Sequence, residues 1–147
     1  MANPGRSLGD VYNALEKLVQ GLSRLLAKKN PVIITPLIAE YFKQLSSSWE
    51  FLNPYLLDGK AETLIEVLTQ NGMLEIPQMA AMLQNTISLN RLHAGDKVNV
   101  IPSAAEAELD IRLLPGADPD SVIADIKKHL ADDNIKVESG GISRASE

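Results

Sequence analysis

Apolar residues recur at spacings of three and four near the start of the chain. The stripe consists of Val11, Leu15, Leu18, Val19, Leu22, Leu25 and Leu26. This spacing places all of them on one face of an α-helix. Asp10 precedes the stripe as an N-cap candidate, and Asn30-Pro31 follows it, where the residue before proline avoids helical backbone angles. The pattern therefore predicts a long amphipathic helix from Asp10 to Lys29.

The segment 31–84 is predicted to be a run of short helices. Thr35-Pro36 places a capping residue before a proline that suits the first helical position, and Asn71-Gly72 is a favourable helix end. This segment contains the single Trp, both Phe and two of the three Tyr residues. Aromatic residues at helical spacing favour a buried core, and an aromatic groove for a ligand is the alternative. The segment is thus expected to be an all-helical insertion.

The pattern then changes from helical spacing to alternation. Between Ser103 and Leu114, small or aliphatic residues alternate strictly with charged ones, which predicts a strand with one buried face. Asn85 to Leu92 is the expected partner strand. His93 to Lys97 is predicted to form a turn, and Val98 to Ile101 to be extended again. Two antiparallel strands joined near Pro102 follow from this pattern.

The last third of the chain predicts one more helix and one more strand. Asp118-Pro119 opens the helix with a cap followed by proline, and Ile135 to Val137 is expected to be a short final strand. Helices and antiparallel strands in this order are typical of an α+β domain with the helices on one face of the sheet. We therefore expect a single domain over residues 1–147, with the helical insertion at 31–84 inside it.

Composition narrows the possible function classes. The net charge of -5 and the pI near 5.0 argue against a nucleic-acid binder, which would need clustered Lys and Arg. The chain has no cysteine, which excludes disulfides and thiolate metal sites. Residues 1–10 lack the apolar core of a signal peptide, and no apolar run approaches the ~20 residues of a membrane span. These features favour a cytoplasmic protein without a membrane or nucleic-acid partner.

No catalytic centre is visible in the residues alone. His93 has Asp96 three positions later, but a pair of this kind in a loop is usually only solvated. Glu106, Glu108 and Asp110 alternate on one strand face, where they could bind a hard cation. A solvated sheet face beside Arg112 is the simpler interpretation. The residues by themselves therefore indicate an α+β domain without a recognisable active site.

Four short motifs occur in order in the second half of the chain. They are Asn85-Thr86-Ile87-Ser88-Leu89, Gly95 to Pro102, Glu106 to Arg112, and Leu114-Pro115-Gly116. Together they resemble the co-catalytic zinc peptidase family M twenty, which includes aminoacylases, carnosinases, carboxypeptidase G and succinyl-diaminopimelate desuccinylase. The resemblance covers about residues 84–137. The helical insertion is similar to that of the N-acyl-amino-acid hydrolase branch.

The resemblance implies a lid, or dimerisation, domain without its catalytic domain. In such enzymes two zinc ions lie in the catalytic domain, and all zinc ligands lie outside the lid. We therefore expect no cofactor, metal ligand or catalytic residue in this chain, no activity of the chain alone, and a homodimer. The resemblance assigns substrate-carboxylate binding to Asn99 and Arg112, for a small amide or peptide substrate. Guanidinium and amide groups suit that ligand.

One departure from the family and several alternatives accompany this interpretation. The family's lid is ferredoxin-like and begins with a strand and a Gly-His-x-Ser-x-Pro stretch, whereas only Asn3 to Ser7 precedes the first helix here, so the first strand is expected to be missing. Asn99 could simply support a turn, and Arg112 could form a salt bridge with Glu108 or another acid of that face. An independent, non-catalytic α+β binding or regulatory module is the alternative function, and a purely structural dimerisation domain is a third.

Overall fold

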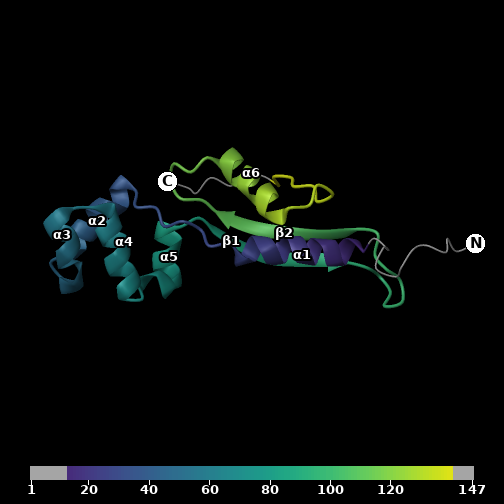
Figure 1. Cartoon of the computed structure of the whole chain (residues 1–147), viewed down its shortest axis with the longest axis horizontal. Helices are drawn as coiled ribbons and strands as arrows, with labels where there is room; N and C mark the ends of the chain where they lie inside the picture. Colours follow the sequence, from purple (N-terminus) through teal and green to yellow (C-terminus); the bar gives the residue numbers. More distant parts are fainter. Residues whose placement is uncertain (1–12, 141–147) are drawn as a thin grey trace, which may run out of the picture. The chain divides into compact units, whose positions relative to one another are not determined.

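The computed structural model describes residues 13–140, which form a mixed α+β structure with one antiparallel two-stranded sheet (Figure 1). The elements in chain order are α1 (Ala14–Ala27), α2 (Pro36–Leu45), the 3-10 helix η2 (Glu50–Leu52), α3 (Asn53–Asp58), α4 (Ala61–Gln70), the 3-10 helix η3 (Met73–Glu75), α5 (Pro77–Leu83), β1 (Thr86–Ala94), β2 (Ala105–Arg112) and α6 (Pro119–Leu130). The α+β class predicted from the sequence is confirmed.

The chain divides into two compact units. Among the described residues, the first unit comprises 13–28, 89–110 and 118–140, and we call it the sheet unit. The second comprises 29–88 and 111–117, and we call it the helical unit. Both strands continue from one unit into the other, because the division falls within β1 and within β2.

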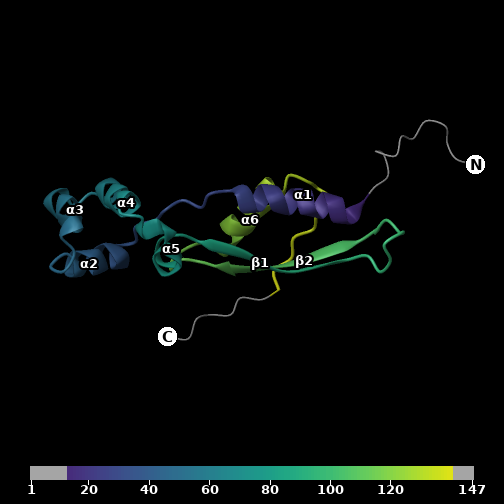
Figure 2. The same ribbon diagram turned by 90° about the horizontal axis from the view of Figure 1, so that it is seen from below.

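In the sheet unit, α1 and α6 lie on the same side of the strands (Figure 2). Helix α1 buries Ala14, Leu18, Leu22 and Leu25, and α6 buries Ile126 and Leu130. The predicted cap Asp10 lies outside the described residues. The side chain of Asn13 caps α1 instead, since its Oδ1 accepts a hydrogen bond from the Glu16 N–H at 3.2 Å. The helix ends at Ala27, shortly before the predicted end.

The predicted final strand over Ile135 to Val137 is wrong. These residues belong to no strand, and the Ile135 N–H donates to the Asp132 carbonyl at 3.1 Å in a turn. The Ile135 side chain packs against α1, where its Cδ1 lies 2.8 Å from the position that a Cβ on Gly21 would occupy. This apolar side chain therefore contributes to the helix packing of the sheet unit rather than to a ladder.

The hairpin differs from its prediction in the connection between its strands. Val98 to Ile101, expected to be extended, lies outside both strands, and the Val100 N–H donates to the Lys97 carbonyl at 3.2 Å in a tight turn. Strand β1 runs through His93, which was assigned to a turn, and ends at Ala94. It ends there because Gly95 has a φ of +69°, which glycine adopts without steric cost.

The predicted alternation in β2 is confirmed. Its apolar positions are half-buried and its charged positions are exposed along the whole strand. In β1 the exposed positions predominate, and Leu92 is 45% exposed. Within residues 13–140 the sheet contains β1 and β2 alone, so the outer edge of each strand has no neighbouring strand there.

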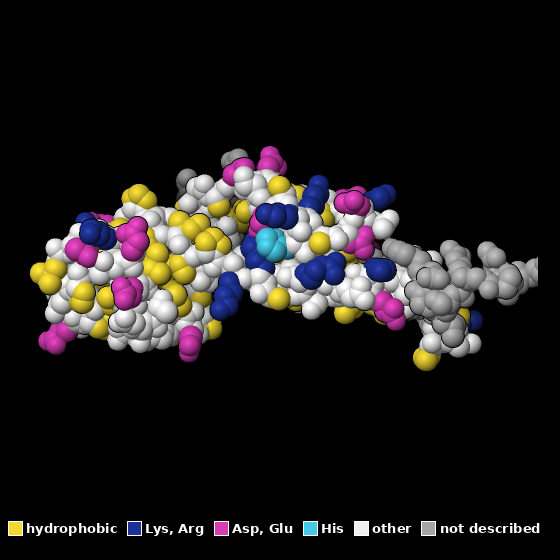
Figure 3. Space-filling model, in the orientation of Figure 1, with side chains coloured by type: hydrophobic (Ala, Val, Ile, Leu, Met, Phe, Trp, Pro, Cys, Tyr) yellow, Lys and Arg dark blue, Asp and Glu magenta, His cyan; other side chains and the backbone are white. Residues whose placement is uncertain are grey.

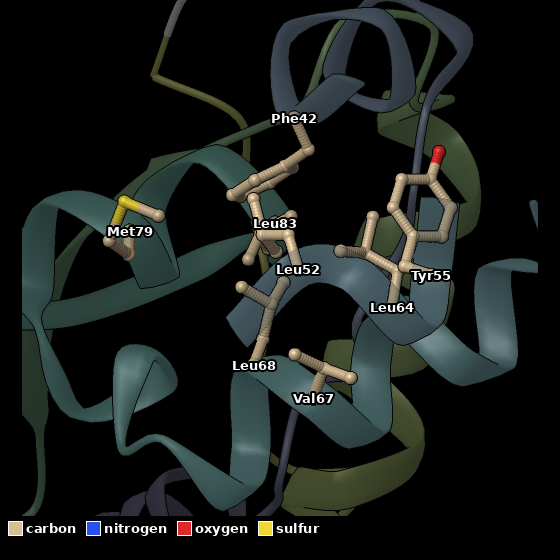
Figure 4. Close-up of a cluster of buried hydrophobic side chains, with 8 residues drawn as sticks. All are labelled: Phe42, Leu52, Tyr55, Leu64, Val67, Leu68, Met79 and Leu83. Atoms are coloured by element: carbon tan, nitrogen blue, oxygen red, sulfur yellow. The ribbon is translucent and has the colours of Figure 1, made fainter. Parts of the chain in front are cut away.

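The helical unit has a closed core of eight buried apolar side chains (Figure 4). The cluster consists of Phe42, Leu52, Tyr55, Leu64, Val67, Leu68, Met79 and Leu83. Helix α2 begins after Thr35, whose Oγ1 accepts from the Ile38 N–H at 3.4 Å, and α4 ends at Asn71 and Gly72 as predicted. Because Phe42 and Tyr55 are part of the core, the core interpretation of these two aromatic residues is confirmed.

Candidate functional site

Asn99 lies at the tip of the connection between β1 and β2, and its side chain is exposed. The base of this connection is fixed to α1, because the Ala14 N–H at the start of the helix donates to the Pro102 carbonyl at 3.1 Å. A Cβ on Gly95 would lie 3.7 Å from Pro102 Cβ, so the two ends of the connection approach each other closely. The tip therefore projects from a fixed base.

The residues beside Asn99 are apolar and exposed. Val98 is fully exposed, and Val100 and Ile101 are 55% and 53% exposed. Together with Leu15 and Pro102, the connection also borders an open hollow of about 350 Å³. An amide between exposed aliphatic side chains is suited to donate a hydrogen bond to a ligand that also offers an apolar surface.

Arg112 is the last residue of β2 and is exposed. It belongs to the helical unit with residues 111–117, whereas Asn99 belongs to the sheet unit. Two positions after Arg112, the Leu114 N–H donates to Asn85 Oδ1 at 2.8 Å. The backbone that follows Arg112 is thus hydrogen-bonded within the helical unit. The alternation of residues in the strand did not predict this hydrogen bond.

The acidic face of β2 contains an ion pair with β1. Arg91 Nη1 lies 3.3 Å from both carboxylate oxygens of Glu108, and both side chains are largely exposed. Such a pair contributes little to stability. Glu108 thus has Arg91 as a cross-strand partner, which supports the interpretation of this face as a solvated surface.

A zinc centre does not fit the described part of the chain. Among residues 13–140, no three His, Cys, Asp or Glu side chains converge closely enough to hold a metal ion. The two histidines lie on different elements, His93 in β1 and His129 near the end of α6.

Helix α1 is joined to α6 by polar contacts at its C-terminal end. Arg24 donates from Nε to the Leu130 carbonyl at 3.2 Å, and Lys28 forms an ion pair with Asp125. The hydrogen bond from Lys28 is the main cause that lowers the pKa of Asp125 below its usual value. The contact between Lys28 and Asp125 joins residues far apart in the sequence, and no local sequence pattern predicted it.

Three large apolar side chains of the sheet unit are exposed. Val19 and Leu26, seven residues apart on one face of α1, are 46% and 47% exposed, and Leu92 of β1 is 45% exposed. The sequence placed Val19 and Leu26 in the same apolar stripe as Leu18, Leu22 and Leu25, which are buried, whereas Val19 and Leu26 are exposed.

Charged side chains of both signs share the surface seen in Figure 3. On this face, several Lys and Arg side chains gather around a histidine near the middle of the view. No helix in the described part of the chain combines the length and the apolar character needed to cross a bilayer.

Curated proteins similar to this chain are much longer hydrolases. The chain is 28% identical over 120 residues to the human N-fatty-acyl-amino acid synthase/hydrolase, which covers 81% of this chain and 24% of that protein. It is 30% identical over 74 residues to the "Probable carboxypeptidase S-like 2" of Dictyostelium discoideum, covering 50% of this chain and 14% of that protein. The mouse N-fatty-acyl-amino acid synthase/hydrolase is 34% identical over 61 residues, with 42% and 12% covered.

These comparisons agree with the motifs around β1 and β2. No solved structure gives a significant match to the chain. The chain spans at most 24% of the length of these relatives. A family model described as the peptidase dimerisation domain, of the M20 peptidases, matches residues 3–138. This match extends over nearly the whole chain, and the chain therefore belongs to the peptidase dimerisation domain family.

Proposed function

We propose that this chain is the lid and dimerisation domain of a zinc-dependent amidohydrolase or peptidase, and that it binds the substrate's carboxylate and contacts a second subunit. The match of residues 3–138 to the peptidase dimerisation domain carries this proposal. The similarity to an N-fatty-acyl-amino acid synthase/hydrolase supports an N-acyl amino acid or a small peptide as substrate. A cytoplasmic location, expected from the composition, stays a prediction.

Arg112 is the proposed main contact of the substrate carboxylate. A guanidinium is planar and can donate two parallel hydrogen bonds to a carboxylate. Asn99 precedes the other end of β2, in the sheet unit, and is proposed as a separate substrate contact through its amide. In the complete hydrolase, Arg112→Ala is expected to cost about 2–4 kcal/mol of transition-state binding for substrates with a free carboxylate. Arg112→Lys should rescue only part of this loss, because an ammonium cannot reproduce the planar fork.

Steady-state kinetics with matched free-acid and carboxamide substrates measures this effect. Arg91→Ala is the control, since Arg91 is also an exposed arginine and it has a partner, Glu108, on the sheet face. It should leave the preference for the free acid unchanged. If Arg112→Ala retains normal kinetics, Arg112 is not the carboxylate contact, and the alternative of a binding or regulatory module gains support.

The zinc ions are proposed to lie in a catalytic domain outside this chain. The described residues offer no converging set of ligands, and zinc sites in proteins need three or four. The chain purified alone should therefore hold no stoichiometric zinc and hydrolyse no N-acyl amino acid. About two tightly bound zinc ions per chain in a metal analysis would contradict this proposal.

The chain is also proposed to self-associate as a two-fold dimer through the sheet unit. Within residues 13–140, β1 pairs with β2 alone and Val19, Leu26 and Leu92 are exposed. Both features support this surface, since an open strand edge and an apolar helix face favour a self-complementary contact. Sedimentation equilibrium at micromolar concentration tests the assembly. A mass that stays near 16.0 kDa would contradict it.

A pair of variants locates the contact. Val19→Glu combined with Leu26→Glu should shift the equilibrium strongly toward the monomer, because both charges would be buried on association. Leu57→Glu is the matched control, since Leu57 is 89% exposed on α3 of the helical unit. If the control dissociates the dimer as strongly as the double variant, the contact is not on α1.

A further inference from the structure

The segment that follows β2 is held at several points within the helical unit. The side chain of Leu114 is only 6% exposed, and its carbonyl accepts from the Ala117 N–H at 3.0 Å in a turn. Gly116 has a φ of +84° in this turn, a conformation that disfavours other residues. The backbone just after Arg112 is therefore fixed by a buried side chain and by a tight turn.

Asn85 supplies a third point of attachment. Its Oδ1 accepts the hydrogen bond from the Leu114 N–H at 2.8 Å, in a partly buried position. This contact joins residues far apart in the sequence, and it is made by a side chain where β1 is about to begin. A backbone N–H away from water needs a partner, so the loss of this oxygen would leave the Leu114 amide unsatisfied.

The backbone of Asn85 is itself held by the helical core. Leu83, two positions earlier, has no exposed surface and belongs to the core cluster. Its carbonyl accepts from the Ile33 N–H at 2.7 Å, and the Gln84 N–H donates to the Ala80 carbonyl at 2.9 Å at the end of α5. A continuous series of contacts therefore runs from the core of the helical unit through Asn85 to the residues beside Arg112.

We propose that Asn85 is a positioning residue for Arg112, and that the helical unit serves through it to fix the direction of the guanidinium. The proposal rests on the proposed function of Arg112 in binding the substrate carboxylate. Asn85 does not contact the substrate. A bidentate contact to a carboxylate depends on the orientation of the planar guanidinium, so a looser backbone after β2 weakens substrate binding more than it slows the chemical step.

Kinetics of the complete hydrolase tests this proposal. Asn85→Ala should raise KM for free-acid substrates about 3- to 10-fold with little change in kcat, the size expected for one lost hydrogen bond. It should also reduce the preference for the free acid over the carboxamide. Asn85→Asp keeps an acceptor oxygen for the Leu114 N–H and should restore KM to within about twofold of the original. Asn85→Ser replaces Asn85→Ala if that variant does not fold, because the shorter side chain leaves the same amide unpaired.

Asn71→Ala is the matched control. The Asn71 side chain also bonds to a backbone group of the helical unit, donating from Nδ2 to the Val67 carbonyl at 2.8 Å in a partly buried position. Its loss should lower Tm by a similar amount and leave KM unchanged. The double variant Asn85→Ala with Arg112→Ala should be no worse than Arg112→Ala alone, because residues that act through one contact are not additive.

The possible outcomes distinguish the positioning role of Asn85 from the carboxylate-binding role of Arg112. Normal kinetics of Arg112→Ala would overturn the carboxylate role itself. A normal KM in Asn85→Ala, together with a lost acid preference in Arg112→Ala, would overturn only the positioning role. Equal changes of KM in Asn85→Ala and Asn71→Ala would also overturn it, because the effect would then follow stability rather than the attachment of Leu114.

Discussion

The helical unit buries eight apolar side chains in one cluster, whereas no residue of β1 or β2 is fully buried. In the helical unit, short helices with one apolar face each meet around a common centre. In the sheet unit, the buried residues come from α1 and α6, and the strands contribute half-buried positions. Within residues 13–140, the helical unit thus has a closed core, whereas the sheet unit has exposed apolar residues on α1 and only two paired strands.

This difference indicates that the sheet unit is the part of the chain with apolar surface available for a partner. Two strands alone are only marginally stable in water, and a helix packed on one side covers a single face. The exposed Val19 and Leu26 on α1 and the open edge of β1 occur together in the sheet unit. The unit whose own core is less complete is thus the one that the proposed dimer would extend.

The largest expected effect concerns the closed core. Phe42 has no exposed surface, and Phe42→Ala should lower the free energy of unfolding by about 3–5 kcal/mol, because it removes a large side chain and leaves a cavity. Denaturant unfolding followed by circular dichroism measures the loss. Leu37→Ala is the control, since Leu37 is 73% exposed on the same helix and should change stability by no more than about 0.5 kcal/mol.

The contrast between the two units would be wrong if truncating a side chain of the half-buried strand β2 cost as much stability as truncating Phe42. Leu109 lies on the half-buried face of β2, and Leu109→Ala should cost clearly less than Phe42→Ala, of the order of 1 kcal/mol. Equal losses would mean that the core of the sheet unit is as complete as that of the helical unit.

A smaller effect is expected at the contact between α1 and the end of α6. A Cβ on Gly21 would lie 2.8 Å from Ile135 Cδ1 and 3.4 Å from Leu130 Cδ2. Gly21→Leu should destabilise the chain by about 1–3 kcal/mol through overpacking. Gly21→Ala should be nearly neutral, because a gain of about 1 kcal/mol in helix propensity offsets a shift of the flexible Ile135 side chain.

Thermal unfolding of both Gly21 variants distinguishes these cases. If Gly21→Leu unfolds like the original chain, the close approach of α1 and Ile135 is absent in solution. Ile135→Ala in the Gly21→Leu background should recover part of the loss, since it vacates the space that the new side chain needs.

The smallest effect is expected at the ion pair between Lys28 and Asp125. Hydrogen bonding to Lys28 lowers the pKa of Asp125, so the stabilisation is fully present above the ordinary Asp pKa of about 3.9 and is lost as the pH falls through the lowered value. Asp125 is 38% exposed, which limits the contribution to about 0.2–1 kcal/mol. Asp125→Asn should therefore lower the Tm slightly at pH 7 and reduce the difference between pH 7 and pH 2.

A comparison of both proteins across that pH range tests the ion pair. An equal acid sensitivity of Asp125→Asn and the original chain would show that Asp125 is not stabilised by Lys28. Lys28→Met should reproduce the loss at pH 7, because it removes the partner and keeps most of the apolar stem.

Local sequence signals were sufficient for several elements that neighbouring residues decide. Asp118 followed by Pro119 fixed the start of α6, because the cap and the proline act within one turn: the Asp118 side chain accepts from the N–H groups of Asp120 and Ser121. Strict alternation identified β2, since its period is set by the strand backbone itself. The order of the four motifs identified the family, which the match to residues 3–138 confirms.

Only the tertiary structure decided the features that depend on residues far apart in the sequence. Ile135 is apolar and β-branched, as a strand residue would be, but Gly21 on α1 gives it a packing site, and no strand in the described residues 13–140 pairs with it. The alternation around Arg112 predicted a strand face and gave no sign of the bond between Asn85 and Leu114. Local patterns determine hydrogen bonding and burial within a helix or strand. The partner of an apolar face or of a backbone amide outside these elements depends on which distant segment of the chain packs beside it.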